Sequence, residues 1–165
     1  MRSRLCVALF LPVLAIMLSA QMKPGLLSGE ELKRAIPSGF YFEGQSAPVQ
    51  MRNTAGFRVQ GNQLVLAGLV DTSGYASDVA AKYQGFLIAG AKIQVGGSEL
   101  SPGAYGFGFS KDGKFTVMDV GGNSILSVAS QTEDKMTHPV PLKMTEDNGT
   151  YRLYAGKQWV SLSAR

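Results

Sequence analysis

Residues 93–120, IQVGGSELSPGAYGFGFSKDGKFTVMDV, restrict the possible folds of this chain more than any other stretch. At their centre, aromatic side chains alternate with very small ones. The aromatic positions are Tyr105, Phe107 and Phe109, and the small ones are Ala104, Gly106 and Gly108. Because successive side chains of a strand point to opposite faces, this pattern predicts a strand with one aromatic face buried in the core. The nearly bare face indicates that something large lies close against it, or that the strand bends sharply there.

Turn residues divide the rest of the chain into short segments. Twenty glycines, all of them after residue 20, are scattered between short apolar runs, which is typical of a fold with many tight turns. Asp112-Gly113 and Asn148-Gly149 are strong hairpin turns. We therefore predict an all-β fold, a single antiparallel β-sandwich of jelly-roll or related topology with about nine or ten strands.

The run LVLAGLV at residues 64–70 is apolar almost throughout. A strand with such a sequence is expected to be central and buried on both faces. Residues 57–60 and the turn Gly61-Asn62 precede it, so the two segments are predicted to form a hairpin.

A short helix is expected near the N-terminal end of the domain. Ser28 and Glu31 have the spacing of a capping box, in which each side chain bonds the other residue's backbone amide. Leu32 and Ile36 share a helix face, and Pro37 ends the helix. We expect this helix to cover an open end or edge of the sheets.

A second short helical insertion is predicted near residues 77–83, within the long connection between residues 71 and 84. Ser77 is expected to cap it, and Asp78 and Lys82 to form an ion pair one turn apart. Val79 and Tyr83 share the opposite face. Because long loops between core strands often carry binding residues, this connection is the predicted variable, ligand-binding surface.

The first twenty residues have the layout of an export signal. Arg2 and Arg4 precede an apolar run, Leu5 to Leu18, and Ala20 offers a small residue at a cleavage position. This run is short for a membrane span, although an uncleaved N-terminal anchor is the alternative. The predicted organisation is a signal peptide at 1–20, a tether and short helix at 21–39 and the β-domain at 40–165. The protein is therefore expected to be secreted or periplasmic, without a membrane span after cleavage.

The remaining 145 residues contain no cysteine, because Cys6 lies inside the expected signal. With 14 basic and 12 acidic residues and no basic cluster, they argue against nucleic-acid binding. The chain has one histidine, His138, so a zinc or copper site would need an unusual set of carboxylates. No calcium-loop motif or phosphate-binding glycine motif is present. We predict no metal site and no cofactor.

Catalytic patterns are equally weak. His138 lies in a polar loop before Pro139, and no nucleophile motif accompanies it. Asp71-Thr72-Ser73-Gly74 resembles an aspartic-protease turn only superficially, since Asp and Ser are ordinary turn formers at a strand end. No carboxylate pair stands out for glycoside hydrolysis, which sequence alone does not exclude. No catalytic residue is assigned, and enzymatic activity stays undecided but disfavoured.

One segment resembles a known family. Val95-Gly96-Gly97, Leu100 to Tyr105 and Lys114 to Val117 are similar to a turn-and-strand motif, GG-x-x-L-x-x-G-x-Y followed by aromatic-Thr-Val, of secreted bacterial β-domain proteins of unknown function. Phe115 stands where that family usually has tryptophan, and its preceding Arg-Thr-Gly segment is absent. The resemblance implies a fold and a compartment, and carries no activity.

The functional prediction is an exported, non-enzymatic binding or envelope accessory protein whose partner, a protein or a small molecule, is unknown. The predicted ligand-binding residues are Asp71, Tyr75, Asp78 and Tyr83. One alternative is a lipocalin-like barrel that holds a small apolar ligand against Tyr105, Phe107 and Trp159. A carboxylate-based hydrolase is the least favoured class.

Overall fold

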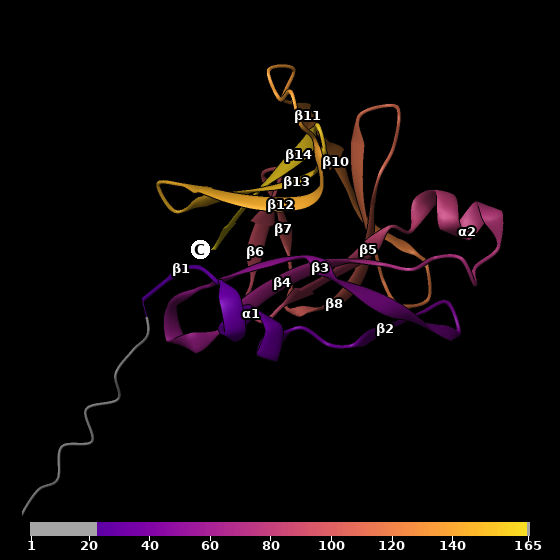
Figure 1. The fold of residues 1–165 in the computed structure, drawn as a ribbon, viewed down its shortest axis with the longest axis horizontal. Coiled ribbons are helices and arrows are strands. Elements are labelled where there is room, and N and C mark those ends of the chain that lie inside the picture. Colours follow the sequence, from indigo (N-terminus) through magenta and orange to yellow (C-terminus); the bar gives the residue numbers. More distant parts are fainter. Residues whose placement is uncertain (1–22, 165) are drawn as a thin grey trace, which may run out of the picture.

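The computed structural model describes residues 23–164 (Figure 1), so the expected signal sequence at 1–20 lies outside the described residues. This part of the chain is mostly β, with fourteen strands in two antiparallel sheets and two α-helices. Neither helix of the described region has the length and hydropathy needed to cross a membrane.

The first sheet has the strand order β1-β3-β4-β5-β8-β9-β10, and β2 also pairs with β3. Its strands are β1 (Gly25–Leu26), β2 (Gly39–Phe42), β3 (Gln45–Arg58), β4 (Leu64–Val70), β5 (Gly85–Ala89), β8 (Gly103–Phe109), β9 (Lys114–Met118) and β10 (Ser124–Ala129). A 3₁₀ turn, η1 (Gln60–Asn62), joins β3 to β4 and contains Gly61 at a φ of 74°. The predicted hairpin between residues 57 and 70 is confirmed.

The second sheet has the order β12-β13-β14-β6-β7, with β11 also paired to β14. Its strands are β6 (Ile93–Val95), β7 (Ser98–Leu100), β11 (Gln131–Thr132), β12 (Val140–Asp147), β13 (Thr150–Gly156) and β14 (Gln158–Ala164). Residues 124–132 change sheets, because β10 pairs with β9 whereas β11 pairs with β14. The described strands outnumber the nine or ten predicted. β1 and β11 are too short to leave a sequence pattern, and the strand expected before the Pro102-Gly103 turn is two short strands, β6 and β7.

The two sheets face each other across a shared hydrophobic core. The fully buried members are Phe57, Val65, Ala67, Leu87, Ile93, Val95, Phe107, Phe115, Val117, Leu153 and Leu162. Phe107 lies 5.4 Å from Phe115 and 6.2 Å from Phe109 between ring centroids. The aromatic face predicted for β8 is therefore confirmed at Phe107 and Phe109. Tyr105 is a correction: it is only half-buried, and its hydroxyl donates to the carbonyl of Ser101.

A second apolar cluster lies on the opposite face of the first sheet, under α1 (Gly29–Ala35), β2 and α2 (Ser77–Lys82) (Figure 1). Leu66 and Val70 of β4 belong to this cluster, whereas Val65 and Ala67 belong to the core between the sheets. The predicted burial of LVLAGLV on both faces is confirmed, because the first sheet is the middle layer of three.

The bare face of β8 receives this outer layer. A Cβ at Gly106 would lie 2.5 Å from the ring of Phe42, which is fully buried on β2. A Cβ at Gly108 would overlap the carbonyl oxygen of Lys82, the last residue of α2. The two glycines therefore permit close approach by β2 and α2.

Both helices form where expected, but three of their predicted contacts do not. Ser28 caps α1 without a side-chain hydrogen bond, and the Glu31 carboxylate pairs with Arg58. Ala76, rather than Ser77, is the N-cap of α2. Lys82 pairs with Glu43, 2.8 Å away between Nζ and Oε1, instead of Asp78. For Glu31 and Lys82, a partner distant in sequence replaces the local one.

Candidate functional site

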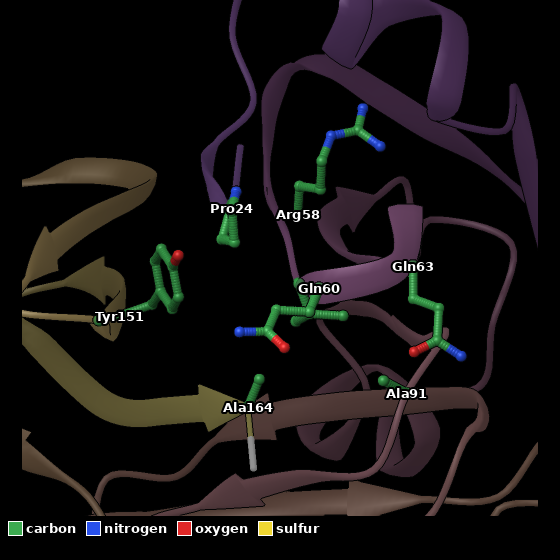
Figure 2. A pocket seen from close by; sticks show the side chains of 9 residues that line it. Pro24, Arg58, Gln60, Gln63, Ala91, Tyr151 and Ala164 are labelled. Carbon is green, nitrogen blue, oxygen red and sulfur yellow. The ribbon is translucent and has the colours of Figure 1, made fainter. Parts of the chain in front are cut away.

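Two clefts open at opposite ends of the paired sheets. The terminal cleft, about 270 Å³ in volume, is lined by Pro24, Arg58, Val59, Gln60, Gln63, Ala91, Gly149, Tyr151 and Ala164 (Figure 2). The loop cleft, about 340 Å³, is lined by Gln50, Leu69, Thr72, Ala80, Tyr83, Gln84, Phe109, Pro141, Ala155, Gly156 and Gln158. The strands β4 and β13 run from one cleft to the other, since each begins beside the terminal cleft and ends beside the loop cleft.

Tight turns bring the polar residues to the terminal cleft. Gln60 begins the η1 turn and Gln63 follows it, and Gly61 and Asn62 within the turn both have positive φ. The amide of Val59 donates to the carbonyl of Gln63 at 2.9 Å and closes the turn. Tyr151 follows the turn of the β12–β13 hairpin, so two separate turns contribute polar residues to one site.

Arg58 is the only charged residue among those that line the terminal cleft, and its charge is already compensated. It is 8% exposed, its guanidinium forms an ion pair with Glu31, and Nη1 donates to Asn62 Oδ1 at 3.2 Å. Figure 2 shows this guanidinium pointing away from Tyr151 and Gln60. The cleft therefore presents no unpaired charge from its described lining.

Tyr151 forms a wall of the same cleft. Its ring stacks on Phe57 with centroids 3.7 Å apart and is 4% exposed. Burial raises the pKa of the Tyr151 phenol, and the nearby Glu146 raises it further. Within residues 23–164, neither this hydroxyl nor the carboxamides of Gln60 and Gln63 form a hydrogen bond. Three neutral groups are thus available to a ligand (Figure 2).

The polar side chains of the loop cleft are more fully engaged by the protein itself. The carboxamide of Gln84 donates to the carbonyl of Phe109 and accepts from its amide, at 2.8 and 3.0 Å. Gln50 donates to the Val70 carbonyl and accepts from Asn53. Gln158 donates to the Ser110 carbonyl at 2.9 Å. These amides hold strand ends and loops together, which is a structural role.

Of the four residues predicted as a ligand site, the structure brings only Tyr75 and Tyr83 into contact. Asp71 is exposed and accepts a hydrogen bond from the Ser73 amide, which lowers the pKa of its carboxyl. Asp78 is exposed in the first turn of α2. Tyr75 and Tyr83 come together, with ring centroids 5.3 Å apart, but in the outer apolar cluster. Of the four, only Tyr83 lines a described cleft.

Tyr83 has a buried hydroxyl without a partner, the only such side-chain group within residues 23–164. Its ring stacks on Phe42 at 4.0 Å and is fully buried. Burial raises the pKa of this phenol, and Tyr75 raises it further. A buried hydroxyl that bonds nothing opposes folding, because it has lost its bonds to water.

Replacing Tyr83 with phenylalanine is therefore expected to stabilise the protein by about 1 kcal/mol. It should also reduce the loss of stability at alkaline pH. The unfolded tyrosine loses its proton near pH 10, whereas the folded one retains it, so this stability falls as pH rises above about 10. Urea unfolding at pH 8 and pH 10.5 measures both effects. Tyr41→Phe, at an exposed position, is the control, and a destabilised Tyr83→Phe would show that the hydroxyl has a partner.

The structure gives less support to a metal site or to an interior that holds an apolar ligand. Within residues 23–164, no group of three His, Cys, Asp or Glu side chains is placed to hold a metal ion. Of the residues proposed to line an apolar interior, Phe107 belongs to the core between the sheets. Trp159 is not among the core residues and instead contacts Tyr154 and Arg152. The guanidinium carbon of Arg152 lies 4.6 Å from the Trp159 ring centroid.

Comparisons with protein-family models, with curated proteins and with solved structures found no match for this chain. The resemblance of residues 95–117 to secreted β-domain proteins therefore stays a prediction.

The residues of the terminal cleft were not identified from the sequence. Gln60 and Gln63 flank a recognisable turn, which was the available signal, but Tyr151 and Ala164 are far from them in the chain. These segments come to one end of the molecule only because their strands pair in the folded sheets.

Proposed function

We propose that this protein is an exported, non-enzymatic binding protein that takes a small, neutral, hydroxyl-bearing ligand such as a sugar in the terminal cleft. One observation carries the proposal. Three uncommitted neutral side chains, Gln60, Gln63 and Tyr151, line a cleft whose only charged lining residue is paired elsewhere.

The chemistry of these groups selects the ligand. A carboxamide both donates and accepts hydrogen bonds, and a phenol does the same, so both suit hydroxyl groups. The apolar walls, Pro24, Val59 and Ala91, suit the carbon-bound hydrogens of a ring. An anionic or cationic ligand would lose its hydration in this cleft without gaining a free opposite charge.

The same lining favours binding over catalysis. General acid–base chemistry needs a group that exchanges a proton near the working pH. Carboxamides do not titrate, and the raised pKa of Tyr151 keeps its phenol protonated at neutral pH. Substrate turnover is therefore not part of the proposal.

The wider architecture and the compartment are part of the same proposal. The core shared by the two sheets supports a β-sandwich, and the largely sequential strand order of the first sheet favours a meander over a jelly-roll. Export is supported by the apolar run at 5–18 and by the cysteine-free sequence that follows. A domain without disulfides depends on its two apolar clusters for stability.

The charge preference can be tested with three sugars of the same ring: glucose, glucuronate and glucosamine. Calorimetric titration is expected to detect binding of glucose and much weaker binding of the two charged sugars. Gln60→Ala and Gln63→Ala should each raise the Kd for glucose about tenfold, since each removes one or two hydrogen bonds. Gln131→Ala is the matched control, because Gln131 is exposed on β11 at the other end of β14. Equal affinity for all three sugars, or unchanged binding in both cleft variants, would contradict the proposal.

A further inference from the structure

The strand β10 has an unusual free edge. It pairs with β9 on one side, ends the order of the first sheet, and contains neither a charged residue nor a proline in the sequence SILSVA. Ile125, Ser127 and Ala129 are exposed. Within residues 23–164, it is the longest strand with a free edge that lacks both kinds of protecting residue.

The backbone of this edge is oriented for further pairing. The amide of Ser130 donates to the carbonyl of Gly113 across the β9–β10 ladder. Because hydrogen-bonded pairs alternate in an antiparallel ladder, Val128 also faces β9, whereas Ser127 and Ala129 direct their N–H and C=O groups away from it. A bulge lies before Leu126, so the regular part of the edge runs from Leu126 to Ala129.

Other edges of the two sheets carry the features that prevent such pairing. The edge strand β12 contains Pro141 and Lys143. The edge strand β7 has three residues, and its Glu99 forms an ion pair with Lys92. Natural proteins use prolines, charges and short strands to block edge-to-edge association. The absence of prolines and charged residues from β10 is therefore a specific feature of this edge.

We propose that β10 is the self-association edge of this protein, where a second copy adds its own β10 antiparallel and extends the first sheet across a two-fold axis. A two-fold axis at Ser127 pairs Ser127 with itself and Leu126 with Val128 of the copy, within the regular part of the edge. Every side chain at this seam is uncharged, so self-pairing places no like charges opposite each other.

A second copy of the same edge offers complementary hydrogen-bonding groups. The outward N–H and C=O of Ser127 in one copy meet the C=O and N–H of Ser127 in the other. Strand pairing alone buries a small area, so we expect a reversible dimer that forms at high micromolar concentrations.

A cysteine at the proposed axis tests this arrangement directly. Opposed residues in a hydrogen-bonded antiparallel pair have Cα atoms about 5.5 Å apart, which is within the span of a disulfide. In a Cys6→Ser background, Ser127→Cys is expected to form a disulfide-linked dimer on mild oxidation. Ser46→Cys, at an exposed position on β3, is the matched control and should stay largely monomeric.

A proline substitution at the same position is the second test of the proposed dimer. Ser127→Pro removes an N–H that faces solvent in the monomer, and proline is tolerated at such edge positions. Circular dichroism should therefore show a folded protein, while sedimentation velocity at several concentrations should show that the wild-type dimer is lost. A dimer that persists in Ser127→Pro, or a wild-type protein that stays monomeric up to millimolar concentration, would overturn the proposal. Equal cross-linking of the two cysteine variants would do the same.

Discussion

Gly108→Ala is expected to destabilise the protein by about 3 kcal/mol, near the upper end of the usual cost of overpacking a core. The added methyl group would overlap the carbonyl oxygen of Lys82. This oxygen belongs to the backbone at the end of α2, so it cannot rotate away as a side chain would. The helix or β8 must move, and the paired hydrogen bonds between Gln84 and Phe109 would be disturbed with them. Urea unfolding measures the change in the transition midpoint.

Substitutions at two further glycines serve as comparisons for Gly108→Ala. Gly106→Ala should also be destabilising, because its methyl group would meet the ring of Phe42 at 2.5 Å. Gly74→Ala, in the loop before α2, would meet no atom within 4 Å and should be nearly neutral. If Gly108→Ala unfolds at the same urea concentration as Gly74→Ala, α2 does not lie against β8 in solution.

Phe107→Ala is expected to cost about 3–5 kcal/mol, the usual range for removing a buried phenylalanine. Phe107 is fully buried and contacts Phe109 and Phe115 in the core between the sheets. Truncation would leave a cavity where both sheets meet, and the surrounding strands cannot collapse into it without losing their register. Chemical denaturation followed by circular dichroism gives the free energy of unfolding.

Tyr105→Ala is the informative comparison because Tyr105 precedes Phe107 by two positions on the same strand face. It is half-buried, and its hydroxyl bonds the Ser101 carbonyl at 2.9 Å. We expect a cost of about 1–2 kcal/mol from one hydrogen bond and a partial loss of apolar burial. Equal effects at the two positions would mean that the aromatic face is uniformly buried, as the sequence pattern alone suggests.

The sequence patterns predicted individual strands correctly where the side chains follow a clear pattern. The apolar run at 64–70 indicated a strand buried on both faces, and β4 lies between two apolar clusters. The small residues of β8 indicated a close neighbour, which the structure identifies as Phe42 and the end of α2. Asp112-Gly113 and Asn148-Gly149 form their turns, with positive φ at Gly113, Asn148 and Gly149.

Patterns failed where partners are distant in sequence or segments are very short. Glu31 and Lys82 each have a plausible local partner, but Arg58 and Glu43 are brought closer by the sheet and take their place. β1 and β11 have two residues each, which is too few for a period to be recognised. β3 has fourteen residues and contains a bulge between Val49 and Thr54 that shifts its register against β4. The mixed polarity of its sequence gives no sign of this shift.

The candidate site was the least accessible part of the molecule to sequence reasoning. The connection at 71–84 attracted attention because of its length, but its tyrosines serve an apolar cluster and Asp71 shapes a turn. The terminal cleft instead combines residues from five separate segments, including Pro24 and Ala164 near the two ends of the chain. Its uncommitted polar members are two glutamines and one tyrosine, which come together only through the fold.

A titration of the ¹⁵N-labelled protein with glucose, followed by nuclear magnetic resonance, is the most direct test of the proposed function. We predict that the side-chain amide signals of Gln60 and Gln63 and the backbone signals of Ala91 and Ala164 shift together with a single Kd. The side-chain amide signal of Gln84, in the loop cleft, should stay unchanged and serves as the internal reference. Shifts confined to the loop cleft, or no shifts in the terminal cleft at saturating glucose, would contradict the account.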